Sequence, residues 1–123
     1  MKKIILKGKI LSTQHIYRST CRGKFPTRYM TREGKELKEL YQLEARVQYK
    51  GKVMSADCDM EIILFFKDKR RRDVDNYNKL VLDSLEGIVY EDDKQIQKLT
   101  VEKKISVEDP RVEIKINFNN SNR

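Results

Sequence analysis

The sequence has few of the residues from which small proteins build structural metal sites or disulfide frameworks. Its 123 residues include two cysteines, Cys21 and Cys58, and one histidine, His15. Because a structural zinc site usually needs four Cys or His ligands, the chain cannot form one by itself. The two cysteines are far apart and lack CxxC spacing, so the sequence gives no indication of a disulfide framework either.

Long apolar runs and linkers are missing as well. No stretch approaches the roughly 20 apolar residues that a membrane-spanning helix requires. The basic start, Met1–Lys7, lacks the sustained apolar segment of a signal peptide. With only two prolines and five glycines, the chain contains no linker rich in either. We therefore predict a cytoplasmic protein with a single folded domain over residues 1–123.

Positive charge is what the sequence has in excess. Lys and Arg number 27 against 19 Asp and Glu, which gives a net charge of +8 and a pI near 9.5. Such an excess favours a polyanionic partner, either nucleic acid or a membrane surface. Because 38% of the residues are hydrophobic, we expect one folded core and not a disordered chain.

Hydrophobic periodicity predicts alternating strands and helices. Apolar spacing of two predicts strands, and spacing of three or four predicts helices. The predicted strands cover residues 4–11, 55–66, 96–107 and 112–118, and the predicted helices cover residues 31–50 and 74–86. The basic stretch 12–29 has no clear periodicity and is predicted to be a long loop. This order predicts an α+β fold, with a small mixed β-sheet and two principal helices.

The pattern also makes predictions about individual helices and strands. In the first long helix, a stripe at helical spacing consists of Leu37, Leu40, Tyr41, Glu44 and Val47, which are apolar except for Glu44. In the strand at 55–66, the even-numbered side chains from Ala56 to Phe66 are predicted to share one buried face. Glu108-Asp109-Pro110 is predicted to join the last two strands as a hairpin. The strand Arg111–Phe118 is predicted to lie at a sheet edge, where a second copy of the chain could pair, and the alternative is that its edge is covered within the monomer.

Acidic residues flank the second predicted helix. Asp73 lies where the chain leaves a strand, Asp75 falls in the first helical turn, and Asp93 follows the helix. Because strand and helix ends can converge, these carboxylates could meet. Three carboxylates without His or Cys form a hard oxygen site, which Mg²⁺ or Mn²⁺ prefers. The pattern therefore predicts a metal site formed by Asp73, Asp75 and Asp93.

A run of cations precedes these acids. Arg70, Arg71 and Arg72 can bind phosphate in a bidentate manner, so we predict that they hold a nucleic-acid backbone. Lys79 is predicted to stand against the scissile phosphate or the leaving group. Phosphodiester hydrolysis needs an activated water and stabilisation of the developing charge, and one or two Mg²⁺ ions can supply both.

These residues also have ordinary structural interpretations. Asp73 can cap the helix, and Asp75 can complement the helix dipole or pair with Lys79 at i,i+4. The arginine run and the acidic turn can be solvated loops. Two acids, three arginines and a lysine within ten residues nevertheless favour a functional site over all of these together.

The same segment resembles the signature of a known nuclease family. Arg72-Asp73-Val74-Asp75-Asn76-x-x-Lys79, then a helix, then Asp92-Asp93-x-Gln95-Ile96, is similar to the motif of the RusA family of Holliday-junction resolvases. The helix phrase Leu82-Asp83-Ser84-Leu85 matches that family too. The resemblance implies that Asp73, Asp75 and Asp93 are metal-binding catalytic residues and that Lys79 is functionally important. Asp92 is the alternative to Asp93 as the third ligand.

The N-terminal stretch resembles the family less closely. The family usually carries Pro-Pro-Ser and asparagines before a Tyr-Arg pair, and this chain keeps Ser12, Tyr17 and Arg18 without the prolines and asparagines. We predict that Tyr17, Arg18 and Asn76 contact DNA, although a loop aromatic such as Tyr17 can equally be a local anchor. His15 is expected to be an ordinary surface residue.

The resemblance implies a Mg²⁺-dependent, homodimeric endonuclease that resolves four-way DNA junctions by paired symmetric nicks during recombination and repair, in the cytoplasm at the nucleoid. Two sites related by a two-fold axis suit the symmetry of a junction. Two alternatives stay open. A non-catalytic basic nucleic-acid-binding protein of the same fold would need no divalent metal. A metal-dependent nuclease acting on flaps or single strands would have no preference for junctions.

Overall fold

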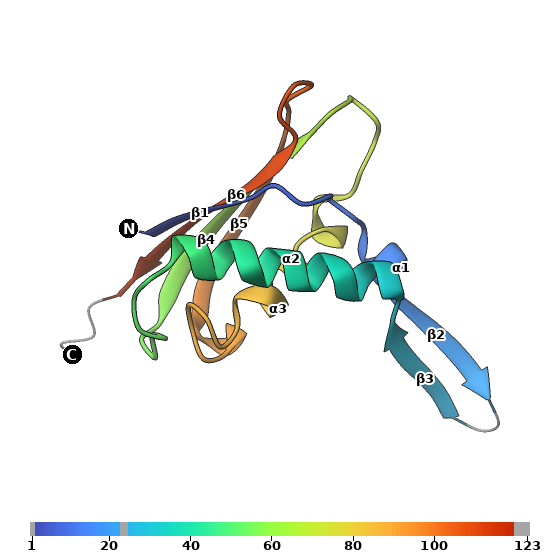
Figure 1. Ribbon diagram of the computed structural model, residues 1–123, viewed down its shortest axis with the longest axis horizontal. Coiled ribbons are helices and arrows are strands. Elements are labelled where there is room, and N and C mark those ends of the chain that lie inside the picture. Colours follow the sequence, from blue (N-terminus) through green and yellow to red (C-terminus); the bar gives the residue numbers. More distant parts are fainter. Residues whose placement is uncertain (1, 23–24, 120–123) are drawn as a thin grey trace.

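The chain forms a mixed sheet with helices packed against one face (Figure 1). The computed structural model describes residues 2–22 and 25–119. Its elements in chain order are β1 (Lys2–Leu6), α1 (Thr13–Ile16), β2 (Tyr17–Arg22), β3 (Phe25–Met30), α2 (Arg32–Gln48), β4 (Cys58–Phe66), the 3₁₀ turn η1 (Val74–Asn76), α3 (Lys79–Leu85), the 3₁₀ turn η2 (Asp93–Gln95), β5 (Ile96–Ile105) and β6 (Arg111–Phe118). The sheet order is β1-β6-β4-β5, with β4 and β5 parallel and the other pairs antiparallel. The predicted α+β fold with a mixed sheet is confirmed.

β4 lies inside the sheet because its apolar residues serve both faces. The predicted face is buried from Cys58 onward, by Cys58, Met60, Ile62, Leu64 and Phe66, whereas Ala56 precedes the strand and is half-buried. On the other face Ile63 is only 7% exposed. A strand that is apolar on both faces near its end is typical of an interior position, with neighbours on both sides.

Two predictions about the C-terminal strands are wrong. β5 and β6 do not form a hairpin, because each pairs with β4 from opposite sides and the connection 106–110 passes the end of β4. The Ser106 N–H donates to the Phe66 carbonyl at 2.7 Å at this crossing. β6 is also not a sheet edge, since it lies between β1 and β4. Its clean alternation reflects one covered face and says nothing about its position in the sheet.

α2 covers the sheet with a stripe different from the one predicted. Its buried side chains include Leu37, Tyr41 and Ala45. Leu40 and Val47, which were expected on this face, are 42% and 62% exposed. At 3.6 residues per turn, Tyr41 and Ala45 lie to one side of Leu37 on the helix surface, and Leu40 and Val47 lie to the other side. The buried stripe is therefore rotated round the helix relative to the predicted one. No helix within residues 2–22 and 25–119 is long and apolar enough to cross a membrane.

Polar side chains of α2 cover the outer edge of β1. The Ile5 N–H donates to Gln48 Oε1 at 2.7 Å, and Gln48 Nε2 donates to the Ile5 carbonyl at 2.6 Å. Glu44, the one polar residue of the predicted stripe, accepts the N–H of Lys7 at 2.7 Å just beyond the strand. Because these contacts occupy the edge of β1, β5 is left as the open edge of the described sheet.

The second predicted helix is shorter than expected. In place of a continuous helix over 74–86, the chain makes the 3₁₀ turn η1 and begins α3 only at Lys79. Asp, Asn and Tyr residues between 73 and 78 favour turns over helix interiors, which explains the interruption. The Thr13 hydroxyl donates to the Asn76 carbonyl at 2.9 Å and ties η1 to α1. Because Asp75 lies in η1 and Lys79 begins α3, these two residues do not belong to one continuous helix.

The stretch predicted to be a loop contains regular structure. α1 and the hairpin β2–β3 occupy it, so the described chain has one α-helix more than the two principal helices expected. Figure 1 shows that the hairpin extends away from the sheet. Strands are recognised in a sequence by apolar alternation, which a hairpin that extends away from the sheet does not need along its length. His15 is exposed, as expected, with its Nδ1 2.9 Å from Ser12 Oγ.

We expect Gly34→Ala to destabilise the fold although it lies within α2. A Cβ at Gly34 would come within 2.8 Å of Ile16 Cγ2 and 3.0 Å of the Ile16 carbonyl oxygen, where α1 rests on α2. The clash should cost about 1–3 kcal/mol, which outweighs the gain of about 1 kcal/mol in helix propensity. Urea unfolding measures the difference, with Lys35→Ala on the exposed side of α2 as the control. A Gly34→Ala variant at least as stable as wild type would contradict this close packing.

Candidate functional site

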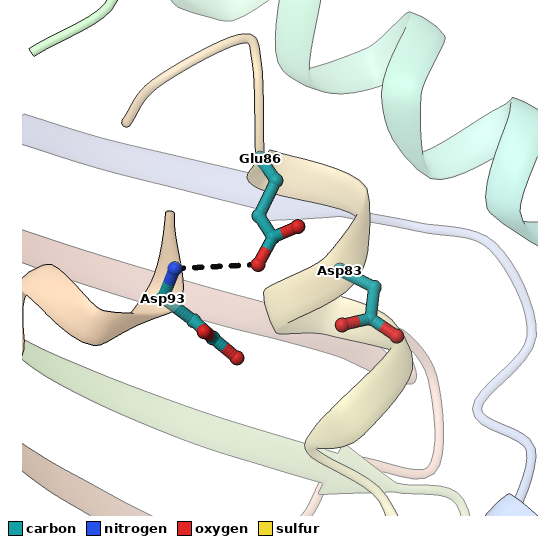
Figure 2. Close-up of side chains that lie close together, drawn as sticks. All are labelled: Asp83, Glu86 and Asp93. Carbon is teal, nitrogen blue, oxygen red and sulfur yellow. Dashed lines mark hydrogen bonds between the residues drawn. The ribbon is translucent and has the colours of Figure 1, made fainter. Parts of the chain in front are cut away.

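A cluster of three carboxylates forms where α3 ends and η2 begins (Figure 2). Asp83 lies in α3 and Glu86 directly follows that helix, so their spacing of three residues puts both on one side of it. Asp93 is the first residue of η2. One carboxylate oxygen from each of the three residues lies within 4.8 Å of the others, and the Asp93 N–H donates to Glu86 Oε1 at 3.2 Å.

A tight turn returns the chain to α3 and brings Asp93 to this position. Gly87 has a φ of 79°, a conformation that glycine adopts without strain. Its N–H donates to the Tyr90 carbonyl at 2.7 Å. The buried Tyr90 hydroxyl then donates to the Leu82 carbonyl at 2.6 Å, which holds the returning segment against the helix.

Gln95 fixes η2 from the other side. Its Nε2 donates to the carbonyls of Met54 and Ala56, both at 2.8 Å, and its Oε1 accepts the N–H of Asp92 at 3.0 Å. The Asp92 carboxylate accepts the N–H of Lys94 at 2.8 Å and caps the turn. Asp92 is therefore engaged in local structure, whereas Asp93 faces the cluster.

Negative charge accumulates at Asp93. Partial burial raises the pKa of its carboxyl group, followed by the hydrogen bond and charge of Asp92 and the charge of Asp83, while Lys79 acts in the opposite direction. The pKa of Asp92 is lowered, mainly by the hydrogen bond from the Lys94 N–H. A divalent cation would relieve the repulsion at Asp93. Three carboxylate oxygens are the donors that Mg²⁺ or Mn²⁺ prefers, so the donor set fits such an ion.

Lys79 and Tyr17 both donate to Asp83. Lys79 Nζ lies 3.2 Å from Asp83 Oδ2, and the Tyr17 hydroxyl donates to the same oxygen at 2.9 Å. Burial, then the hydrogen bond to Asp83, raises the pKa of Tyr17 to about 12, so the phenol keeps its proton. The ion pair that Lys79 forms is with Asp83, and the alternative pairing with Asp75 is wrong. The Tyr17 hydroxyl is thus bonded within the chain, and the DNA contact predicted for Tyr17 stays a prediction.

Asp73 and Asp75 lie at η1 and are exposed. Within the described residues, the one group of three or more potential ligands contains neither of them. Asp73 precedes the turn, and its carbonyl accepts the Asn76 N–H at 3.1 Å, but its carboxylate makes no capping hydrogen bond. The structure thus brings Asp93 together with two acids outside the predicted set, and the roles of Asp73 and Asp75 stay predictions.

The three consecutive arginines have different surroundings. The Arg72 guanidinium lies 4.3 Å from the centroid of the Phe66 ring, and its Nη2 is 2.9 Å from Asp68 Oδ1. Arg72 therefore helps to hold the loop after β4. Arg70 and Arg71 are exposed, and neither forms an ion pair with any residue of the described ranges. Their side chains are available to an external anion.

A groove of about 680 Å³ lies beside η1. Its lining includes Ser12, Gln14, Arg71, Asp73, Asn76 and Lys103. It brings two predicted DNA contacts, Arg71 and Asn76, next to the predicted ligand Asp73. Lys103 comes from β5, and its Nζ donates to the Arg72 carbonyl at 2.8 Å. The groove is lined by polar and cationic side chains, which suits the binding of a phosphate backbone.

Asp83, Glu86 and Lys103 were not among the site residues predicted from the sequence. Asp83 lies within the Leu82-Asp83-Ser84-Leu85 phrase of the family resemblance, and that was the available signal. Glu86 has only its spacing from Asp83, which is common on helix surfaces. Lys103 alternates along β5 with other charged residues, and only the sheet register brings it to the groove.

Comparison with known protein families gave one finding. A family model described as Endodeoxyribonuclease RusA matches residues 9–117. The match extends well beyond the motif between Arg70 and Ile96 and includes the N-terminal stretch with Tyr17. A search of curated proteins gave no match.

Proposed function

The chain belongs to the RusA family of endodeoxyribonucleases, and from this premise we propose that it resolves four-way DNA junctions with the help of a divalent metal ion. The observation that carries the proposal is the family match over residues 9–117, nearly the whole chain. The carboxylate cluster at the end of α3 supports the metal requirement. In the same proposal, residues 1–123 are one nuclease domain that acts in the cytoplasm at the nucleoid.

The proposed ligands form two overlapping sets. Asp73, Asp75 and Asp93 come from the family motif, and the geometry adds Asp83 and Glu86 as neighbours of Asp93. Asp93 belongs to both sets, and the capping role of Asp92 makes Asp92 the weaker candidate. Mg²⁺ is the proposed ion, with Mn²⁺ as a substitute. When bound, it would activate a water molecule and stabilise charge on the scissile phosphate.

Cations around the acids would hold the substrate. The Lys79 side chain is 48% exposed and lies beside the cluster, so its ammonium group can neutralise a phosphate oxygen or the leaving group. Arg70 and Arg71 would bind the flanking backbone, with Arg72 shaping their loop, and Asn76 would contact it in the groove. The exposed Arg18, near the base of the hairpin, would add a further contact.

A homodimer follows from the same proposal. Two active sites on a two-fold axis would cut two strands of like polarity, which leaves ends that can be rejoined. The open edge of β5 supports pairing between copies, and Leu99 and Ile105 on this strand are 37% and 46% exposed. An edge strand with exposed apolar side chains favours association with another chain.

The function is tested by incubating the protein with a labelled four-way junction in Mg²⁺. A matched linear duplex and an EDTA reaction are the controls. We expect symmetric nicks in the junction and no cutting of the duplex. Binding without metal-dependent cutting would favour the non-catalytic alternative. Equal cutting of junctions, flaps and single strands would favour the general nuclease.

Replacing Arg70 and Arg71 together by alanine is expected to weaken binding to all junction sequences alike. Phosphate groups carry no sequence information, and removing one arginine–phosphate interaction should reduce the slope of log affinity against log salt by roughly one unit. Fluorescence anisotropy at several salt concentrations measures both quantities. A double replacement of Arg46 and Lys50, exposed near the end of α2, removes the same charge away from the groove. An identical slope in both double variants would mean that Arg70 and Arg71 lie in a solvated loop and do not contact phosphate.

A further inference from the structure

We propose that Tyr17 is a positioning residue that orients the Asp83 carboxylate toward a bound divalent ion and so couples the β2–β3 hairpin to the metal site. The inference rests on the proposed function, because it assumes that the carboxylate cluster holds a metal. It assigns to Tyr17 a role other than the DNA contact predicted from the sequence. Tyr17 would act through Asp83 and would not itself touch the reacting atoms.

The geometry around Asp83 carries the inference. Two donors from different parts of the chain meet at one oxygen, since the Tyr17 hydroxyl lies 2.9 Å and Lys79 Nζ lies 3.2 Å from Oδ2. A carboxylate held by two hydrogen bonds at one oxygen has restricted rotation. Partners of this kind orient metal ligands and commonly alter metal affinity when they are removed.

Of the two donors, Tyr17 is the more rigid. Its side chain has two torsion angles and a planar ring, whereas the flexible four-carbon stem of Lys79 lets the ammonium group move. The ring is further restrained by cations, because the Arg28 guanidinium lies 4.9 Å and Lys79 Nζ 5.3 Å from its centroid. Tyr17 therefore sets the direction in which Asp83 is held, and Lys79 adds charge.

Tyr17 is also fixed by its position at the base of the hairpin. It is the first residue of β2 and pairs with Met30 at the end of β3. Just before it, the Ile16 carbonyl accepts the Thr31 N–H at 2.7 Å, which joins the base of the hairpin to the start of α2. The hairpin extends from this base away from the sheet (Figure 1). A force on the hairpin from bound DNA would therefore reach Asp83 through one side chain.

The test uses Mn²⁺ binding to the full chain without DNA, measured by electron paramagnetic resonance of free Mn²⁺. Tyr17→Phe keeps the ring and removes the hydroxyl, and we expect roughly tenfold weaker Mn²⁺ affinity. Tyr29→Phe, which removes an exposed hydroxyl from the same hairpin, is expected to bind Mn²⁺ as wild type does. Unchanged affinity in Tyr17→Phe would overturn the inference, as would wild-type protein without saturable Mn²⁺ binding.

A double-mutant cycle separates positioning from general stability. In an Asp83→Asn background, Tyr17→Phe should cause no further loss of Mn²⁺ affinity, because the residue through which it acts is already changed. A further loss of the same size would assign Tyr17 a purely structural role and overturn the inference. Wild-type protein that binds Mn²⁺ but cuts no junction would contradict the proposed function alone. Junction cutting with unchanged affinity in Tyr17→Phe would contradict the inference alone.

Discussion

Replacing Asp93 by asparagine is expected to reduce junction cleavage by about a thousandfold, or about 4 kcal/mol of transition-state stabilisation, while junction affinity stays near wild type. Asp93 is the one acid shared by the family motif and the carboxylate cluster. Asparagine has the same shape without the charge, so it removes a metal ligand and leaves the DNA-binding cations in place. Single-turnover cleavage in Mg²⁺ and anisotropy in EDTA measure the two effects separately.

Glu91→Gln is the matched control for Asp93→Asn. Glu91 is exposed in the same acidic turn and lies outside the cluster, so its variant should cut like wild type. Rapid cleavage by Asp93→Asn would exclude Asp93 from the site. Asp73→Asn and Asp75→Asn are expected to abolish cleavage as well. Rapid cleavage by both of these variants would instead leave Asp83, Glu86 and Asp93 as the ligand set.

A mixed dimer of one wild-type and one Asp93→Asn subunit is expected to nick one strand of a junction and to leave it unresolved. Each site would act on one strand, so the loss of one site removes the second cut and with it nearly all of the linear product. Co-expression with two different affinity tags isolates the mixed dimer. Denaturing and native gels then count nicked strands and resolved duplexes in the same reaction.

The dimer itself is checked before DNA is added. Sedimentation equilibrium at micromolar concentration should give twice the chain mass of 14.7 kDa. A mass near 14.7 kDa with full junction-cutting activity would defeat the preformed dimer. A mixed dimer that resolves junctions as fast as wild type would show that one site makes both cuts in turn.

The sequence by itself determined the family and most of the secondary structure. The motif between Arg70 and Ile96 is contiguous, so its chemistry can be recognised without knowledge of the fold, and the family match confirms the resemblance. α2, β4 and β6 were predicted because each buries side chains at a regular spacing, which leaves a periodic pattern in the sequence. The break before α3 weakened the periodic pattern of the second predicted helix. The hairpin β2–β3 has no clear apolar periodicity, so it was not predicted.

Only the tertiary structure decided which of these pieces meet. Periodicity tells which face of an element is buried but not which element covers it, so the interior position of β6 and the open edge of β5 depended on strand pairing. The turn at Gly87 brings Asp93 to Asp83 and Glu86. Tyr17 reaches Asp83 across 66 residues of sequence. Contacts of this kind follow from the packing of the whole chain, and no local spacing encodes them.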